Sequence, residues 1–444
     1  MLTNIKQVIE KLDSLTKTKS IRVISHFDTD GITSAAIFSK ALKRWHKNFS
    51  LQIVKNLEES IIKSLPEDQI LVFLDLASNS LNYLAEKKTN IFIFDHHEII
   101  QKIPENVTMI NPLIFNHEPI ASSGICYLFA KSLSEQNKDL ANLAIIGMIG
   151  DAHEKNIGKT YSEILKDSGT TIKKGLLLYP STRPLDRTLE YSSSPYIPGV
   201  TSSFKGVLEI LREANIQKNG KEFKSLHELN EEEMINLTTA IMLRLSKKSP
   251  HNERELQNLI GNIYLVKFFN KLEDARELSA LINACSRMDR PEVSLGFCLN
   301  SRFHKELAEK IYIEYKQHLI SALKYFSETQ EKIFGNKYAI INAKDKIKDT
   351  IIGTVISIIS HSPAYEEGTI IIALAYNQDK IKVSARIAGH SDKNVREVLN
   401  KAVISFGGEV GGHSSAAGCL ISKEKEEAFI QELQKVLEVE PLKA

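Results

Sequence analysis

Three short apolar runs near the start of the chain have the length and composition of buried β-strands. They cover residues 21–25, 70–74 and 91–94, contain β-branched or aromatic side chains, and are bounded by polar residues. Apolar residues at helical spacing follow in 32–45 and 123–133. Because alternating strands and helices are typical of βαβ units, we expect an α/β domain built on a mainly parallel sheet.

The middle of the chain has a different pattern. Residues 156–205 are rich in Pro, Ser and Gly, so we expect mainly loops there. From 206 to 335, apolar residues recur at three- and four-residue intervals while Glu and Lys fill the other positions, as in amphipathic helices. The predicted helices cover residues 204–213, 230–246, 253–259, 272–285 and 305–326.

The last 110 residues return to a mixed pattern of strands and helices. Strands are predicted at 338–342, 369–376 and 381–386, and helices at 394–405 and 423–437. We therefore divide the chain into a first α/β domain at 1–205, a helical connector at 206–335 and a smaller α/β domain at 336–444.

Acidic and histidine side chains gather just after the first strand-like runs. Strands of a parallel sheet end at a common edge, so these side chains are expected to converge there. Two like charges about 4 Å apart repel by about 4 kcal/mol at an effective dielectric near 20, so a cation is the simplest explanation for the group. Its members are His26, Asp28, Asp30, Asp75, Asp95, His96, His97 and, further along, Asp151.

Mixed carboxylate and imidazole ligands suit a pair of divalent cations. Carboxylates can bridge two ions, and such a pair can clamp a phosphodiester and activate water. Nitrogen ligands favour Mn²⁺ over Mg²⁺, although Mg²⁺ stays an alternative. A single Asp after a strand is more often just a helix cap, so the metal prediction depends on the whole set.

These motifs resemble those of a known superfamily. His-x-Asp-x-Asp-Gly, a lone Asp, Asp-His-His and a later Gly-Asp are similar to the four motifs of the DHH phosphoesterases. Far downstream, the run Gly411 to Gly418 resembles the Gly-Gly-His element of the associated DHHA1 domain, and Ser384-Ala385-Arg386 resembles its Ser-x-Arg. Within the superfamily the chain is similar to archaeal RecJ-like nucleases. One departure is Val410, where relatives often have a third Gly.

The resemblance implies a role for each residue of the first domain. His26 and Asp28 would bind one metal ion, Asp30, His96 and Asp151 the other, and Asp75 both. His97 would face the scissile phosphate, so His97 and Asp75 are the predicted catalytic residues. Asp95 would orient an imidazole.

In the second domain, the resemblance implies a phosphate-binding site made of Ser384, Arg386, Gly411, Gly412 and His413. Small residues let backbone N–H groups approach an anion, and a guanidinium suits bidentate contact with phosphate. A cleft between the two α/β domains would then hold a single strand. The segment 195–199, Pro-Tyr-Ile-Pro-Gly, is either a solvent-facing connection or part of the substrate channel.

Composition excludes some classes of protein. A net charge of +2 and a pI near 8.1 argue against a surface coated with basic residues for duplex nucleic acid. We expect no membrane span, since apolar runs of 18 residues are absent from the sequence. The four cysteines are dispersed and form no Cys-x-x-Cys pair, so we expect them buried, in a reducing, cytoplasmic setting: Cys126, Cys285, Cys298 and Cys419.

Three weaker features remain. Gly158-Lys159-Thr160 ends like a phosphate-binding loop, but His153 stands where that motif needs its first Gly, so we reject an NTPase. For His153 itself we favour an ordinary polar contact over a role beside Asp151. Arg287, in an Asn-Ala-Cys-x-Arg stretch similar to a RecJ-like one, is equally a nucleic-acid contact or a surface residue at a helix end.

The expected function is a Mn²⁺-dependent exonuclease acting on single-stranded DNA or RNA, with roles in DNA repair or replication. One alternative is a nano-RNase or nucleotide phosphoesterase that acts on very short substrates. Another, also implied by the resemblance, is a replication scaffold that binds the GINS complex.

Overall fold

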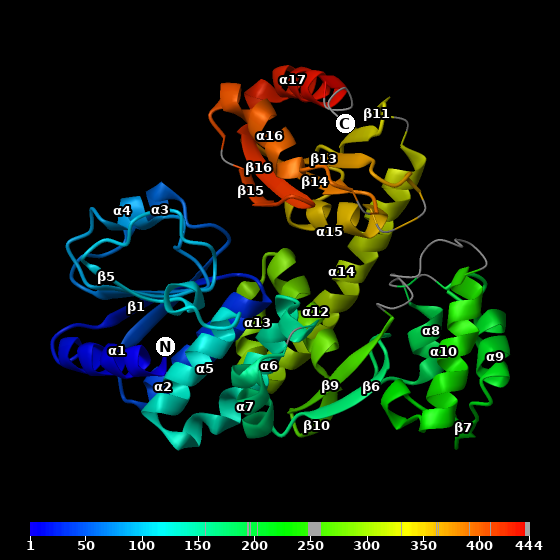
Figure 1. The fold of residues 1–444 in the computed structure, drawn as a ribbon, viewed down its shortest axis with the longest axis horizontal. Coiled ribbons are helices and arrows are strands. Elements are labelled where there is room, and N and C mark those ends of the chain that lie inside the picture. The colour runs from blue at the N-terminus through cyan, green and yellow to red at the C-terminus, as the bar shows by residue number, and fades with distance from the viewer. Residues whose placement is uncertain are drawn as a thin grey trace. The chain divides into compact units, whose positions relative to one another are not determined.

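The computed structural model describes residues 1–155, 157–192, 195, 197–201, 203–246, 259–329, 331–360, 362, 364–389, 391–408 and 410–439. The chain divides into two compact units, Met1–Glu309 and Lys310–Ala444, and each is described by itself (Figure 1). Of the helix predicted at 253–259, all but the last residue lies outside the described residues. Tyr196, in the Pro-Tyr-Ile-Pro-Gly segment, also lies outside the described residues.

A five-stranded sheet with strand order β2-β1-β3-β4-β5 forms the centre of the first unit, and all four pairs of neighbouring strands are parallel. This confirms the predicted parallel sheet. Its strands are β1 (Ile21–His26), β2 (Phe49–Val54), β3 (Ile70–Leu74), β4 (Ile91–Phe94) and β5 (Val107–Ile110).

The central strands of this sheet are buried on both faces. Phe73 and Ile93 pack in a cluster with Leu81 of α4 (Leu81–Leu84), near α3 (Glu59–Ser64). On the opposite face, the ring of Phe94 lies 5.3 Å from that of Phe38 in α2 (Thr29–Arg44) and 5.3 Å from that of Phe129 in α5 (Ser122–Leu133). Burial on two sides explains why these strands are continuous apolar runs. The chain begins with α1 (Leu2–Leu15), as its amphipathic pattern predicts.

The helix α6 (Ala141–Gly150) is apolar around almost its whole circumference because it lies among other helices. It packs against α2, α5 and α12 (Ala275–Arg287), and it ends at Asp151. The helical connector therefore contributes α12 to the packing of the first domain.

The region after Asp151 contains more regular structure than predicted. Within 156–205, which we expected to be mainly loops, lie α7 (Lys159–Ser168), β6 (Thr171–Leu176) and α8 (Leu185–Glu190). The strand β6 pairs with β9 (Ile260–Phe268), which pairs in turn with β10 (Lys271–Asp274), in an antiparallel sheet that was not predicted. The helix predicted from 272 begins only at Ala275, because Asp274 caps it and the residues before it belong to β10.

The middle of the chain is otherwise helical, as predicted. Buried residues of α8, α9, α10 and the neighbouring strands share one apolar cluster. Two short strands, β7 (Lys218–Asn219) and β8 (Glu222–Phe223), pair beside it. The helices are α9 (Phe204–Glu213), α10 (Glu231–Ser246), α13 (Pro291–Cys298) and α14 (Arg302–Glu328).

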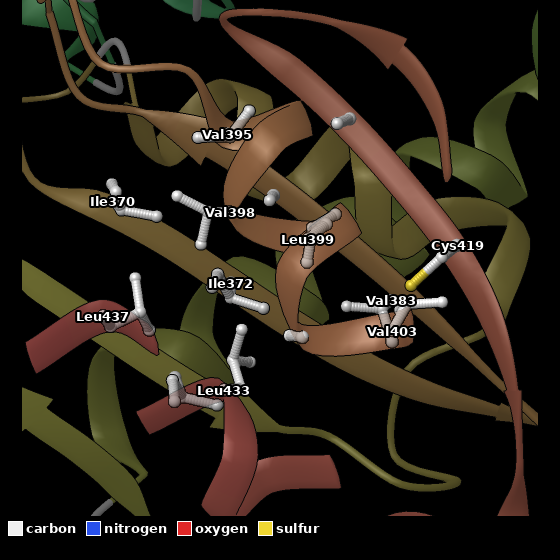
Figure 2. Packing of buried hydrophobic residues seen from close by; sticks show 14 of the residues in the cluster. Ile370, Ile372, Val383, Val395, Val398, Leu399, Val403, Cys419, Leu433 and Leu437 are labelled. Atoms are coloured by element: carbon white, nitrogen blue, oxygen red, sulfur yellow. The ribbon is translucent and has the colours of Figure 1, made fainter. Parts of the chain in front are cut away.

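The second unit is built on a six-stranded mixed sheet with strand order β11-β12-β13-β14-β16-β15. Only β12 and β13 pair in parallel. Figure 2 shows α16 (Val395–Val403) and α17 (Glu426–Val439) packed on one face, where Leu399 and Leu433 meet Ile372 and Val383. The strands are β11 (Lys332–Gly335), β12 (Tyr338–Asn342), β13 (Ile370–Asn377), β14 (Lys380–Ile387), β15 (Val410–His413) and β16 (Ala416–Ser422).

The Gly-rich motif of this unit forms a β-hairpin. Residues 410–413 make up β15, residues 416–422 make up β16, and only Ser414 and Ser415 form the turn between them. Gly412 has φ +113°, and an added Cβ there would lie 2.3 Å from the carbonyl oxygen of Ala416. Glycine is therefore required at this position.

All four cysteines are free and buried, as predicted. Among the described residues, each helix is too short or too polar to cross a lipid bilayer.

Candidate metal centre

The first three residues of the centre lie where β1 meets α2. His26 ends the strand, and Asp28 caps the helix by accepting a hydrogen bond from the N–H of Gly31 at 3.0 Å. Asp30 lies in the first turn of the helix with its side chain fully buried. A Cβ at Gly31 would lie 2.3 Å from the carbonyl oxygen of His26, so only glycine lets the chain turn back this tightly.

Asp30 is held by the start of another helix. Its two carboxylate oxygens accept hydrogen bonds from the backbone N–H groups of Ser122 at 2.7 Å and Ser123 at 2.9 Å. Both groups belong to the first turn of α5, whose unpaired N–H groups and dipole favour a negative charge. The sequence analysis missed both serines. Their place at the start of a predicted helix was a signal for capping, but not for the identity of the partner.

Asp75 lies directly after β3, between two imidazoles. One carboxylate oxygen, Oδ2, is 3.4 Å from Nδ1 of His26, and the other, Oδ1, is 3.4 Å from Nε2 of His96. The Ser122 hydroxyl donates a hydrogen bond to Oδ1 at 3.1 Å. Asp75 is 2% exposed, and its φ of +60° is uncommon for a residue other than glycine. Strained backbone of this kind concentrates at functional sites.

His96 and Asp151 complete the group. Nε2 of His96 lies 3.0 Å from Asp151 Oδ2 and 4.0 Å from Asp30 Oδ2. Asp151 follows the last residue of α6, so a helix end, and not a strand, places it.

Among the described residues, four overlapping groups have potential ligand atoms within 4.8 Å of one another, and two of these groups contain only the six predicted metal ligands. Asp75 belongs to both groups. One group is His26, Asp28 and Asp75, and the other is Asp30, Asp75, His96 and Asp151. The structure thus brings together all six residues for which the resemblance implies metal binding, in the same two sets.

Burial and repulsion between carboxylates change the proton affinities in this centre. Burial, together with the charges of Asp28 and Asp30, raises the pKa of Asp75 to about 8. Burial and Asp30 likewise raise the pKa of Asp151 to about 6. For His96, burial opposes protonation, but hydrogen bonds to Asp151 and Asp75 prevail and raise its pKa above the usual value. The centre therefore attracts positive charge strongly.

Three buried polar atoms of the centre find partners only among the other charged groups of the centre: His26 Nδ1, Asp75 Oδ2 and Asp151 Oδ2. Buried polar atoms that lack a well-aligned hydrogen bond are rare and need an explanation. Carboxylate oxygens and imidazole nitrogens are the donor set that Mn²⁺ accepts, so the residues fit divalent cations.

His97 points its ring at a different carboxylate. Its Nδ1 lies 2.7 Å from Asp95 Oδ1, while Asp95 Oδ2 accepts hydrogen bonds from the N–H and hydroxyl of Ser78 at 3.1 and 2.5 Å. Asp95 is fully buried, whereas the His97 side chain is 49% exposed. The hydrogen bond that His97 donates to Asp95 raises the pKa of His97, although burial acts against it. Asp95 thus orients His97, and Ser78 is a supporting residue that the sequence analysis missed.

His153 lies beside the metal centre, although we expected it to make only an ordinary polar contact. Its ring centroid is 5.6 Å from that of His96, and a ring nitrogen lies within 4.8 Å of ligand atoms of His96 and Asp151.

At the start of α7, Glu118 accepts hydrogen bonds from the N–H groups of Lys159 at 2.9 Å and Thr160 at 2.5 Å. A carboxylate of the protein occupies the place where a phosphate-binding loop would hold its ligand, which supports rejection of an NTPase.

The five residues predicted to bind phosphate come together in the second unit. On β14, Ser384 pairs with Gly418, which pairs with Gly411. Two residues further along β14, Arg386 pairs with Ala416, which pairs in turn with His413 on β15. Gly412 lies between Gly411 and His413 on β15. The guanidinium of Arg386 donates to the Ser357 hydroxyl at 3.0 Å from Nε.

Comparison with known families matches three successive parts of the chain. The N-terminal domain of the DHH family matches residues 20–148, the DHH-CID domain residues 178–260, and the DHHA1 domain residues 335–439. Each metal-centre residue except Asp151 lies within the first match.

The chain is also similar to individual proteins. An uncharacterized protein of Methanocaldococcus jannaschii, MJ0831, is 29% identical over 98% of this chain and 99% of its own length. The structure is similar to CDC45 from Entamoeba histolytica, with a TM-score of 0.65 at 14% identity over 98% of this chain and 99% of that one.

It is also similar to two RecJ structures, each at 16% identity over 97% of this chain. One is RecJ from Thermus thermophilus in complex with Mn²⁺, at a TM-score of 0.60, of which this chain spans about half, 54%. The other is exonuclease RecJ bound to manganese, at a TM-score of 0.59 and 93% of that chain. The chain therefore belongs to the DHH superfamily, with DHH, DHH-CID and DHHA1 domains in one RecJ-like fold.

Proposed function

We propose that this protein is a metal-dependent exonuclease that hydrolyses single-stranded DNA or RNA by a two-metal mechanism. The observation that carries the proposal is the position of Asp75, which is shared by two groups of ligand atoms. Because one carboxylate can bridge two ions, this arrangement suits a pair of cations better than a single one.

The two groups divide the ligands of the proposed ions. His26 and Asp28 would hold one ion, Asp30, His96 and Asp151 would hold the other, and Asp75 would supply an oxygen to each. When bound, two divalent ions neutralise charge on a phosphodiester and lower the pKa of a water molecule. Two imidazoles among the ligands favour Mn²⁺ over Mg²⁺.

His97 acts on the substrate in this proposal. Its Nδ1 is bonded to Asp95, so its Nε2 is available to a phosphate oxygen or a leaving group. Because Asp95 raises the pKa of His97, it favours the protonated imidazole, the form that can donate a proton to a leaving group. Asp95 is a positioning residue that acts through His97.

The second unit binds the phosphate backbone of the substrate. Arg386 supplies a guanidinium, Ser384 a hydroxyl, and Gly411, Gly412 and His413 a strand with little side-chain bulk. Contacts of this kind hold a nucleic acid without reading its sequence.

A second candidate function, a GINS-binding replication scaffold in the cytoplasm, is favoured by the similarity to CDC45 over nearly the whole chain. The six predicted ligands are held together despite the repulsion between their carboxylates, which argues for a catalytic role. Catalysis can coexist with a role in replication or repair.

Hydrolysis of end-labelled oligonucleotides tests the function. Single-stranded DNA and RNA, the matching duplexes and a dinucleotide are each incubated with Mn²⁺. A ladder of single-nucleotide steps from long single strands supports the proposal. Cleavage of the dinucleotide alone would indicate a nano-RNase. If no substrate is cleaved, the replication scaffold becomes the favoured function.

The substitution Asp75→Asn tests metal binding without an activity assay. Since the raised pKa keeps the Asp75 carboxyl group largely protonated in the metal-free protein at neutral pH, Asn replaces a neutral group of similar shape, and we expect the metal-free variant to unfold at about the same temperature as the wild type. Mn²⁺ at a hundred times its Kd should stabilise the wild type by about 2.7 kcal/mol and the variant hardly at all. Differential scanning calorimetry measures both.

The matched control is Asp68→Asn, an exposed carboxylate just before β3. It should keep the full Mn²⁺ response. An equal stabilisation of Asp75→Asn by Mn²⁺ would contradict the assignment of Asp75.

Metal affinity should rise with pH. The raised pKa values of Asp75, near 8, and of His96 mean that both hold protons in the metal-free protein at neutral pH. Ligands must be deprotonated, so Mn²⁺ binding should release protons, and affinity should weaken as pH falls below 8. Titration calorimetry in buffers of different ionisation enthalpy counts the released protons. Affinity that stays constant between pH 6 and 8 would argue against these ligands.

The substitution Asp95→Asn tests how His97 is positioned. The protonated form of His97 is lost as pH rises through its raised pKa, so the wild-type rate should fall on the alkaline side. Without the carboxylate that pKa is lower, and the fall should move to lower pH, with kcat reduced by about 10²–10⁴. The Mn²⁺ affinity should not change. A pH profile identical to that of the wild type would refute the role of Asp95.

A further inference from the structure

One face of β14 carries Lys382 in addition to the predicted phosphate-binding residues Ser384 and Arg386. Val383 and Ala385 belong to the apolar cluster that includes α16 and α17. Because side chains alternate along a strand, Lys382, Ser384 and Arg386 project from the opposite face. The helix α15 (Asp349–Ser360) lies on that face, where a Cβ at its Gly353 would be 3.5 Å from Ser384 Oγ and 3.9 Å from Arg386 Nη2.

The ammonium group of Lys382 reaches the Gly-rich hairpin. A Cβ at Gly418 would lie 3.7 Å from Lys382 Nζ. Gly418 is the residue of β16 that pairs with Ser384 on one side and with Gly411 on the other. The Lys382 head therefore lies beside the row formed by Ser384, Gly418 and Gly411.

This row leaves room for a ligand. Gly411 is exposed, and a Cβ there would meet no described atom within 4 Å. Two glycines thus form a surface without side chains, with an ammonium group beside it and the Arg386 guanidinium two residues further along β14. Arg386 and Ser384 are about 7 Å apart along the strand, an interval comparable with that of successive phosphates in an extended single strand.

The ammonium group of Lys382 is partly buried, and among the described residues none forms an ion pair with it. Burial lowers the pKa of Lys382 and the charge of Arg386 adds to this shift, while Cys419 and Asp349 act in the opposite direction. A partly buried cation without a partner is costly, and an anionic ligand would remove that cost.

We propose that Lys382 is a second phosphate-binding cation, so that the second unit holds two successive phosphates of a nucleic-acid backbone and not a single phosphate group. The inference rests on the proposed function and narrows its substrate to chains with at least two phosphates. It adds a residue outside the Ser-x-Arg and Gly-Gly-His motifs to the binding surface.

The salt dependence of binding tests this inference. Lys382→Met keeps the length of the side chain but removes its charge. The full-length protein is titrated with a labelled single-stranded oligonucleotide at several salt concentrations, with EDTA present to prevent hydrolysis. Since each phosphate contact to a single strand contributes about 0.7 to the slope of log K against log salt, Lys382→Met should reduce that slope by about 0.7. Its affinity at low salt should fall several-fold.

Three controls make the result specific. Lys382→Arg should restore the slope, because it restores the charge. Lys401→Met, at an exposed residue of α16 on the other side of the sheet, should leave slope and affinity unchanged. Unfolding temperatures measured for each variant show that the fold is intact, and Lys382→Gln replaces Lys382→Met if the latter is unstable.

A kinetic comparison separates this inference from the proposed function. Bis(p-nitrophenyl) phosphate carries one phosphate, so Lys382→Met should raise the KM for an oligonucleotide by a larger factor than the KM for this small substrate. An unchanged slope and KM, with the wild type active, would overturn the role of Lys382 alone. A wild type that neither binds nor hydrolyses single strands would overturn the function and the inference together.

Discussion

Everything at the metal centre depends on holding several carboxylates together out of water. Two such charges at about 4 Å cost about 4 kcal/mol at an effective dielectric near 20, and Asp75 faces both Asp28 and Asp30. The protein offsets part of this repulsion with the serine hydroxyl and imidazoles around Asp75 and with the two N–H groups that bind Asp30. The remaining excess of negative charge is what a bound divalent cation would neutralise.

The fold makes this concentration of charge possible through its parallel sheet. Neighbouring strands β1, β3 and β4 end side by side, so the residues that follow them meet although they are far apart in the chain. The helices then fix the geometry. The N–H group of Thr29, at the start of α2, donates to Asn283 of α12 at 3.1 Å, which ties the helical connector to the loop that carries Asp28. Rigid support of this kind is needed because small displacements of ligands weaken a metal site.

Much of this could be predicted from the sequence, because strong apolar runs and metal-ligand chemistry are local signals. The strand at 70–74 and the helix at 204–213 have the predicted bounds, and the six proposed ligands lie together. The signals that failed depend on tertiary structure. Ser122 and Ser78 contact the centre only because distant segments pack against it, and β9 is a strand because β6 and β10 pair with it. Lys382 was not predicted as a binding residue because its ammonium group meets the Gly-rich motif only across paired strands.

The central claim is that Asp75 lies between two divalent ions. Crystals of the full-length protein grown with Mn²⁺, and measured on both sides of the manganese absorption edge, test it most directly. We expect two anomalous peaks, one beside His26 and Asp28 and one beside His96 and Asp151, with Asp75 contacting both. A single peak, or peaks that Asp75 does not contact, would contradict it.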